Sequence, residues 1–232
     1  MKSLAKLKPL VIIALAASAL IAGCATENSG GFSATSALLR GMVYNGNRMP
    51  VQDASVNWIV EGKTVKTART DIHGRYLMPE VSFGKVTLQF VKAGYEELLW
   101  SFSYEKPTQV VYVRMSSFNE LLDDAAANIQ KRNWAQAASS LDRAEKMDPD
   151  NVVVVYLQAE MQSRQGNLEK AVALLEGLSS RKDQSFAVEL SLADLYQDKL
   201  GQPDKALLHL KSALAIQDDI EVENRIVELE KR

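Results

Sequence analysis

The chain has 232 residues, of which 47% are hydrophobic, and an apolar N-terminal segment accounts for part of that fraction. The formal net charge is −2, and no stretch concentrates the basic residues that a nucleic-acid-binding face requires. A single cysteine excludes an internal disulfide, so each domain has to be held together by its own packed core.

The N-terminal segment has the three-part layout of an export signal. Three lysines within the first eight residues precede an apolar run, residues 10–22, which is shorter than a membrane-spanning helix. Ile21, Gly23 and Cys24 at its end resemble the cleavage box of bacterial lipoproteins, which has an aliphatic residue three places before the cysteine. The resemblance implies removal of residues 1–23 and attachment of diacylglycerol and a further acyl chain to Cys24. The alternatives are an ordinary signal peptide with a chance cysteine, or a buried free thiol at Cys24.

The residues after Cys24 indicate where the anchored chain would sit. Ala25 stands where an aspartate would retain a lipoprotein in the inner membrane of enterobacteria-like envelopes, so the resemblance implies the periplasmic face of the outer membrane. Residues 25–36 are small and polar and include two glycines, which indicates a flexible tether. A coil of that length spans about 20 Å. We therefore expect residues 24–36 to hold the first domain close to the membrane.

Residues 37–115 show short runs in which polar and apolar side chains alternate, as they do in strands with one buried face. Turn signals, such as Asn45-Gly46 with its two-residue turn chemistry, recur about every ten residues. The pattern predicts an antiparallel β-sandwich of the seven-stranded type. Trp58 lies in an alternating run and is expected in the core. Trp100 follows two leucines, so the pattern does not indicate whether its side chain is buried or exposed.

The same residues resemble the carboxypeptidase regulatory-like domain, a transthyretin-type sandwich. The matching segments are Gly41–Val43, Pro50–Val56, Thr70–Tyr76 and Lys92–Tyr95. The resemblance implies a tight turn built by Asp71 and Gly74, and inward packing of Ala54 and Val56. That family is structural or adhesive in most settings and sometimes contacts carbohydrate, and the resemblance brings no catalytic residue with it.

Residues with catalytic or metal-binding chemistry are sparse. The chain has two histidines, His73 in the strand region and His209 in the helical region, whereas a metal site needs three or four ligands. We therefore expect His73 to be an exposed imidazole in a turn. The sequence contains no phosphate-binding loop, no nucleophile-elbow serine and no cysteine besides Cys24. We expect no enzymatic activity, no cofactor and no metal ion.

From Phe118 onward the apolar period changes from two to about 3.6, which predicts helices. Two sets of alanines recur at steps of 34 or 35 residues: Ala125, Ala159 and Ala193, and Ala137, Ala171 and Ala206. This period resembles the tetratricopeptide repeat, a hairpin of two helices. The resemblance implies an α-α superhelix of three units, residues 118–151, 152–185 and 186–219, closed by a capping helix, residues 220–232. The alternative is a plain bundle of helical hairpins.

Small residues have a physical role in such repeats, because two helices cross at 8–10 Å only where side chains are small. The family has small residues at three positions per unit, and only Leu178 departs from them here. Gly166 and Gly201 suit the turn between the helices of a unit, where the first unit has Arg132. The third unit holds one extra residue near Leu200.

The tetratricopeptide resemblance also implies a concave groove lined by the first helix of each unit. The expected groove residues are Leu122, Ala126, Ile129 and Gln130 in unit one, Val153, Tyr156, Glu160 and Arg164 in unit two, and Leu190, Asp194 and Gln197 in unit three. Residues 118–232 carry a net charge of −7. We expect the groove to hold a protein segment with apolar anchors and a basic flank. The alternative is that three repeats act only as a spacer.

Together these patterns predict an envelope lipoprotein, anchored to the membrane through Cys24, that acts as a non-enzymatic scaffold or assembly factor. Its partner would be an unidentified envelope protein bound in the repeat groove. A second hypothesis is a ligand-binding, glycan-binding or transport-accessory lipoprotein that uses the sandwich or the groove. An exposed pair of aromatic side chains on the sandwich would favour this second hypothesis.

Overall fold

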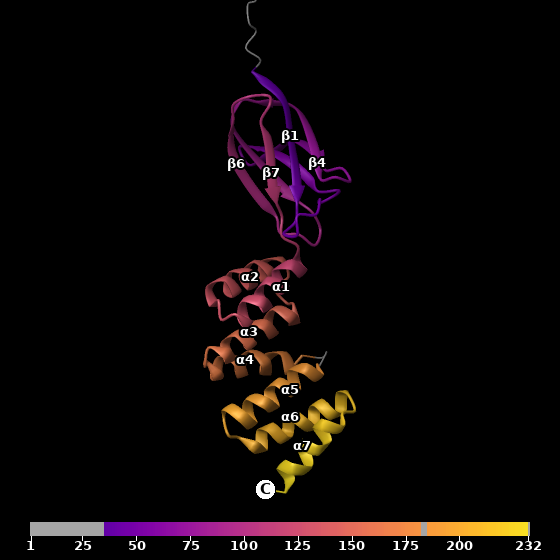
Figure 1. Ribbon diagram of the computed structural model, residues 1–232, viewed down its shortest axis with the longest axis vertical. Coiled ribbons are helices and arrows are strands. Elements are labelled where there is room, and N and C mark those ends of the chain that lie inside the picture. Colours follow the sequence, from indigo (N-terminus) through magenta and orange to yellow (C-terminus); the bar gives the residue numbers. More distant parts are fainter. Residues whose placement is uncertain (1–34, 182–184, 232) are drawn as a thin grey trace, which may run out of the picture. The chain divides into compact units, whose positions relative to one another are not determined.

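The computed structural model describes residues 35–181 and 185–231 (Figure 1). The expected signal, Cys24 and most of the expected tether lie outside these residues. The described chain begins with seven strands: β1 (Ser36–Tyr44), β2 (Ser55–Val60), β3 (Lys63–Arg69), β4 (Arg75–Ser82), β5 (Gly84–Val91), β6 (Leu98–Tyr104) and β7 (Val110–Arg114).

The strands form two sheets, one with the order β4-β1-β7 and one with the order β3-β2-β5-β6. This confirms the predicted β-sandwich. One pair departs from the antiparallel expectation, because β7 runs parallel to β1, with Gly41 opposite Val111. Strand β6 was not recognised in the sequence, because three consecutive apolar residues, Leu98–Trp100, break the alternation.

The core of the sandwich is built by alternate residues of the strands. Ala54 and Val56 are fully buried in it, as the family resemblance implies. Trp58 packs against the same core, as expected from its alternating run. A Cβ atom on Gly41 would lie 2.2 Å from the ring of Tyr76, so only glycine fits at this point of β1.

The turn between β3 and β4 has the expected form. The N–H of Gly74 donates to the carbonyl of Asp71 at 2.9 Å, and the Asp71 carboxylate accepts the N–H groups of His73 and Arg75, both at 2.8 Å. Gly74 has a φ of +71°, and a Cβ there would lie 2.3 Å from the carbonyl oxygen of Val43. His73 is exposed, as expected, and the described residues contain no cluster of three or more metal-ligating side chains.

The prediction of a two-residue turn at Asn45-Gly46 was wrong. The Asn45 side chain accepts the N–H groups of Asn47 and Met49 at 3.0 and 2.9 Å, which makes a wider turn. The N–H of Asn45 donates to the carbonyl of Met49 at 2.8 Å, and Tyr44 pairs antiparallel with Pro50, so the chain folds back over a longer turn than predicted. It then crosses to the other sheet, to which β2 belongs.

The second part of the chain is helical. It comprises α1 (Phe118–Gln130), α2 (Trp134–Met147), α3 (Val152–Arg164), α4 (Leu168–Ser179), α5 (Phe186–Asp194) continued by a π-helical turn η1 (Leu195–Lys199), α6 (Pro203–Ile216) and α7 (Ile220–Glu230). Consecutive helices pack as pairs, α1 with α2, α3 with α4 and α5 with α6, which confirms the predicted helical repeats (Figure 1). Within the described ranges, none of these helices is long and apolar enough to cross a bilayer.

Helix α1 begins with a capping box at Ser117. The hydroxyl of Ser117 accepts the N–H of Glu120 at 3.2 Å, and the Glu120 carboxylate accepts the N–H of Ser117 at 3.0 Å. Nearby, Nε of Arg143 on α2 donates to the Glu96 carboxylate at 2.9 Å. Burial raises the pKa of Glu96, but the hydrogen bonds and charge of Arg143 outweigh it, so the pKa lies below its ordinary value.

Alanines hold the helix crossings as the repeat pattern predicts. The side chains at these positions are at most 1% exposed: Ala125, Ala137, Ala144, Ala159, Ala171, Ala193, Ala206 and Ala213. Leu178, the exception to the pattern, is also buried, at 3%. The small side chains let the helix backbones approach closely, and the larger apolar residues fill the space between crossings.

The turns within the three helix pairs each contain one residue in the left-handed region. Gly166 and Gly201 have φ values of +84° and +62°, and Arg132 adopts +58° at the matching place in the first pair. The N–H of the residue after Arg132 donates to the carbonyl of Asn128, as the residue after Gly166 donates to Gln162, both at 2.9 Å. Arginine in place of glycine therefore leaves the hydrogen bonding of the turn unchanged. It does require a residue with a side chain to adopt a left-handed backbone conformation.

We predict that Arg132→Gly stabilises the protein, because it removes a left-handed conformation that costs a non-glycine residue about 1 kcal/mol. Chemical denaturation followed by the helical circular dichroism signal measures the change in the free energy of unfolding.

The matched control is Gly166→Ala, which introduces the same strain in the second pair. A Cβ at Gly166 meets no atom within 4 Å, so its effect is confined to the backbone. We expect a loss of about 1 kcal/mol. Equal stability of Arg132→Gly and the parent chain would show that the turn carries no such strain.

Candidate functional site

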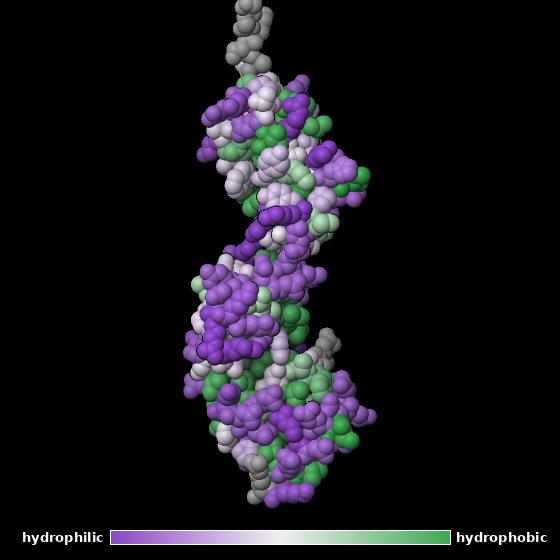
Figure 2. All heavy atoms as spheres, viewed as in Figure 1, coloured by the Kyte–Doolittle hydropathy of each residue, from purple (hydrophilic) through white to green (hydrophobic). Residues whose placement is uncertain are grey.

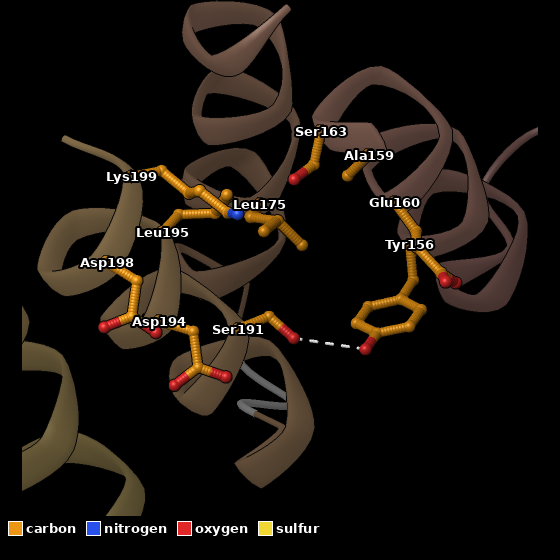
Figure 3. Close-up of a pocket in the computed structure, with 10 residues that line it drawn as sticks. All are labelled: Tyr156, Ala159, Glu160, Ser163, Leu175, Ser191, Asp194, Leu195, Asp198 and Lys199. Carbon is orange, nitrogen blue, oxygen red and sulfur yellow. Dashed lines mark hydrogen bonds between the residues drawn. The ribbon is translucent and has the colours of Figure 1, made fainter. Parts of the chain in front are cut away.

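The candidate site is an open cavity of about 200 Å³ between α3 on one side and α5 with η1 on the other (Figure 3). Helix α4 contributes to its base. The lining residues are Tyr156, Ala159, Glu160, Ser163, Leu175, Ser191, Asp194, Leu195, Asp198 and Lys199.

The base of the cavity is apolar. Ala159, Leu175 and Leu195 come from α3, α4 and η1 and are nearly fully buried. Ala159 is one of the small residues at the helix crossings, and Ser163 lies one helical turn further along the same face. Because both side chains are short, they leave space where longer ones would fill the cavity.

One wall is fixed by a hydrogen bond between α3 and α5. The hydroxyl groups of Tyr156 and Ser191 lie 3.1 Å apart (Figure 3). The Ser191 hydroxyl donates to the carbonyl of Ala187 at 2.7 Å, so its proton is already used. Tyr156 is therefore the donor to Ser191. This bond holds the tyrosine ring at the cavity wall with part of the ring accessible.

The rim of the cavity carries charges of both signs. Glu160 pairs with Arg164 one turn along α3 at 2.9 Å, and Asp194 pairs with Arg225 of α7 at 2.8 Å. Asp198 is exposed and forms no ion pair among the described residues. Two of the three rim carboxylates are thus already neutralised, and Asp198 is the one left to meet a cationic group.

A second, more polar hollow adjoins the cavity and shares Asp194 and Asp198 with it. Its volume is about 350 Å³. The other lining residues are Leu190, Gln197, Asp219, Glu221, Val222 and Arg225, which come from α5, η1 and α7 with its N-terminal cap. The two hollows adjoin at Asp194 and Asp198, and their linings extend from α3 and α4 over α5 and η1 to α7.

The structure brings a subset of the expected groove residues together. Tyr156, Glu160 and Asp194 line the cavity, and Leu190 and Gln197 line the adjoining hollow. Arg164 lies at the rim, bonded to Glu160, and Val153 is 48% exposed at the start of α3. Units two and three therefore supply the site.

The expected residues of unit one lie apart from it. Leu122 and Ala126 pack against the core of the first helix pair, and Gln130 is exposed at the end of α1. Ile129 is fully buried in that core and offers no surface to a partner. Its assignment to the groove was therefore wrong. The side chain of Ile129 lies in the core that α1 forms with α2 and α3 and does not reach the surface.

The extra residue of the third unit is accommodated as a π-helical turn within the helix. The turn itself contains Asp198 and Lys199, and both line the cavity. Sequence reasoning did not name Leu175, Ser191, Leu195 or Lys199 as site residues. The 35-residue step between alanines was the available signal, because it placed an insertion in this region.

A buried polar network holds η1 in place. The hydroxyl of Tyr196 donates to Glu176 on α4 at 2.6 Å, and its ring stacks on His209 of α6 with centroids 5.5 Å apart. Nδ1 of His209 lies 2.8 Å from the buried carboxylate of Glu189 on α5. Burial, reinforced by Glu176, raises the pKa of Tyr196 to about 12. The network links three helices and fixes the turn that forms one side of the cavity.

Comparisons with known proteins agree with the helical part of this description. A tetratricopeptide repeat family profile matches residues 128–195, from the end of α1 to the start of η1. No curated protein sequence matches the chain.

Several solved structures resemble the chain over about half its length. The N-terminal domain of stress-induced protein-1 from C. elegans is 17% identical and has a TM-score of 0.42, with 49% of this chain and 94% of that one covered. A tetratricopeptide repeat protein from Parabacteroides merdae is 23% identical with a TM-score of 0.42, covering 48% and 45%. The TPR2AB domain of yeast Sti1 in its pHSP90 complex is 13% identical with a TM-score of 0.43, covering 49% and 46%. The profile match over residues 128–195, together with the pairwise packing of the helices, supports a tetratricopeptide-type arrangement in this part of the chain.

We predict that Leu195→Ala destabilises the chain by about 2–5 kcal/mol, because Leu195 is 6% exposed at the base of the cavity and its removal enlarges the void. Thermal and chemical unfolding measure this loss. Leu208→Ala is the matched control, since Leu208 is 62% exposed on α6, and its effect is expected within about 0.5 kcal/mol of zero. Similar losses for both variants would mean that Leu195 is not part of a packed base.

Proposed function

We propose that this chain is a non-enzymatic scaffold of the cell envelope that holds a protein partner through the cavity between α3 and η1. The observation that carries the proposal is an open cavity with an apolar base and a mixed polar rim, in a tetratricopeptide-type array. Arrays of this kind present one face for binding, and they rarely carry out chemistry.

The size of the cavity supports recognition of one apolar side chain of the partner. An apolar cavity of about 150 Å³ is large enough to take up benzene. The cavity here is about 200 Å³ and is bounded by Leu175, Leu195 and the ring of Tyr156. An aromatic or branched aliphatic side chain of an extended or helical segment would fill it, with the rest of the segment lying along the rim.

Charge supports a basic flank beside that anchor. Residues 118–232 have a net charge of −7, and hydrophilic residues dominate the face of the helical part shown in Figure 2, with smaller hydrophobic areas between them. Asp198 is the rim carboxylate without an ion pair among the described residues, and it stands where a lysine or arginine next to the anchor could reach it. Such complementarity speeds association and orients the segment.

The sandwich gives less support to the second hypothesis, glycan or ligand binding. The two most exposed aromatic side chains of the described strands are Trp100, at 46%, and Tyr112, at 62%. Trp100 belongs to β6 of one sheet and Tyr112 to β7 of the other, so they do not form a stacking pair on one face. The described residues thus lack the exposed aromatic pair that would favour this hypothesis.

The envelope location is the part of the proposal that rests on sequence. The basic lead, the apolar run and the box that ends in Cys24 support a lipid anchor on the outer membrane. Two or more acyl chains bind a bilayer firmly, whereas one alone binds marginally. The anchor would keep the scaffold close to envelope partners and raise their effective concentration.

We predict that a photoreactive amino acid in place of Ser163 crosslinks one specific protein in living cells, because this position faces the cavity. In the same background Tyr156→Ala should weaken the association by about 2 kcal/mol, or roughly thirtyfold, as expected for an aromatic residue at the centre of an interface. Crosslinked bands identified by mass spectrometry give the readout.

The control places the same photoreactive residue at Leu208, which is exposed on α6 and does not line the cavity. Circular dichroism of Tyr156→Ala verifies that the helices persist. A band pattern that is the same from positions 163 and 208, or that survives Tyr156→Ala, would rule out the cavity as the binding site.

We also predict that Cys24→Ser releases the chain from membranes, because the acyl chains would lose their attachment atom. Fractionation followed by a high-salt wash measures the effect, with the parent chain as control. A variant that still sediments with the membrane after the wash would contradict the anchor.

A further inference from the structure

The two sheets of the sandwich have four edge strands, β3 and β6 on one sheet and β4 and β7 on the other. An edge strand presents unpaired N–H and C=O groups that can pair with another strand. Soluble proteins protect such edges with charged residues, proline, bulges or short length.

Three of the edges are protected. Strand β3 carries Lys63, Lys66 and Arg69 within seven residues. Strand β4 contains Pro79, and Glu80 next to it has a φ of +56°, which interrupts the regular edge. Strand β7 is five residues long and ends in a charged residue.

Strand β6 has none of these features. Its seven residues, Leu98–Tyr104, include no charged residue, no proline and no glycine. Leu99 is 62% exposed and Trp100 is 46% exposed. Within the described ranges β6 pairs along one side only, with β5. The side chain of Gln109 donates to the carbonyl of Ser103 at 2.9 Å, which covers one end and leaves Leu98–Phe102 open.

We propose that β6 pairs antiparallel with β6 of a second copy of this chain. The two-fold axis would pass near Trp100, the middle of the open segment, and stand perpendicular to the sheet. The two four-stranded sheets would then join into one sheet of eight strands. This interaction goes beyond the scaffold function and depends neither on the cavity nor on a lipid anchor.

The chemistry of β6 favours a second copy over an unrelated strand. Strand β6 carries no charged residue, so the strand that pairs with it has to be uncharged as well. The same segment on a second copy of the chain meets this condition. A perpendicular two-fold axis keeps each face of the sheet continuous, so Trp100 lies opposite Trp100 and Leu98 opposite Phe102. Contacts between identical patches close after two copies and do not propagate.

The pairing also removes the exposed apolar surface of the edge. Trp100 gains an aromatic partner directly across the strand pair, which is a favourable cross-strand contact. Leu99 lies opposite Ser101 on the other face and loses part of its exposure. The free N–H and C=O groups of the open segment gain partners in the same step.

Sedimentation of the full chain over a range of concentrations tests the proposal. We expect a monomer–dimer equilibrium in the parent chain, and at least a tenfold weaker dimer for Trp100→Lys, because two lysines would oppose each other at the axis. The matched control is Val65→Lys, since Val65 is 52% exposed on β3, the other edge of the same sheet. Circular dichroism and thermal melting verify that both variants fold as the parent does.

A crosslinking experiment tests the register. In a Cys24→Ser background an introduced cysteine is the only thiol of the chain. Residues directly opposite in an antiparallel pair have Cα atoms about 4.5–5.5 Å apart, within the range of a disulfide. We expect Trp100→Cys to form a covalent dimer on mild oxidation and Val65→Cys to remain monomeric.

The outcomes separate cleanly. A dimer that is lost with Trp100→Lys and retained with Val65→Lys, together with the residue 100 disulfide, supports the pairing. A chain that stays monomeric at every concentration and forms no such disulfide overturns it. A dimer that is insensitive to Trp100→Lys, or assembly beyond two copies, overturns it as well. Since these variants leave the cavity unchanged, the photocrosslinking result tests the scaffold function separately.

Discussion

The close crossing of helices at alanine is the constraint on which the helical part of the molecule depends. Ala125, Ala159 and Ala193 are all at most 1% exposed, and each allows two helix backbones to approach within the packing distance of small side chains. Ala159 has a second effect, because the same short side chain forms part of the base of the cavity. Tight packing and the open cavity thus have a common origin, and a larger residue at this position would disturb both.

The sequence predicted the helix pairs well because their period is a direct result of packing. It located the insertion in the third unit near Leu200 but could not decide whether a loop or a helix would absorb it. That choice depends on hydrogen bonding and on the network of Tyr196, Glu176 and His209, which joins residues distant in the chain. Leu175 was not anticipated, since the family positions refer to the first helix of each unit and this residue belongs to the second.

The sandwich shows where alternation succeeds as a signal and where it fails. Ala54 and Val56 were correctly placed in the core, because a strand between two neighbours buries every second residue. Strand β6 lies at the rim of a four-stranded sheet that faces a three-stranded one, so part of its inward face has no opposing strand. Both faces of β6 therefore carry apolar residues, and polar and apolar side chains do not alternate at its start. Ile129 is the opposite case: a position assigned from the family turned out to be fully buried.

The last helix, α7, covers the apolar core of the third helix pair and also contributes to the surface beside the cavity. Arg225 of α7 binds Asp194 at 2.8 Å and the side chain of Gln197 at 3.0 Å, so the C-terminal segment sets the charge of the surface that the repeats present. Removing this helix would therefore change the charge and the hydrogen bonding of that surface. Under the proposed function, shortening the array from its C-terminal end would change the surface that it offers to a partner.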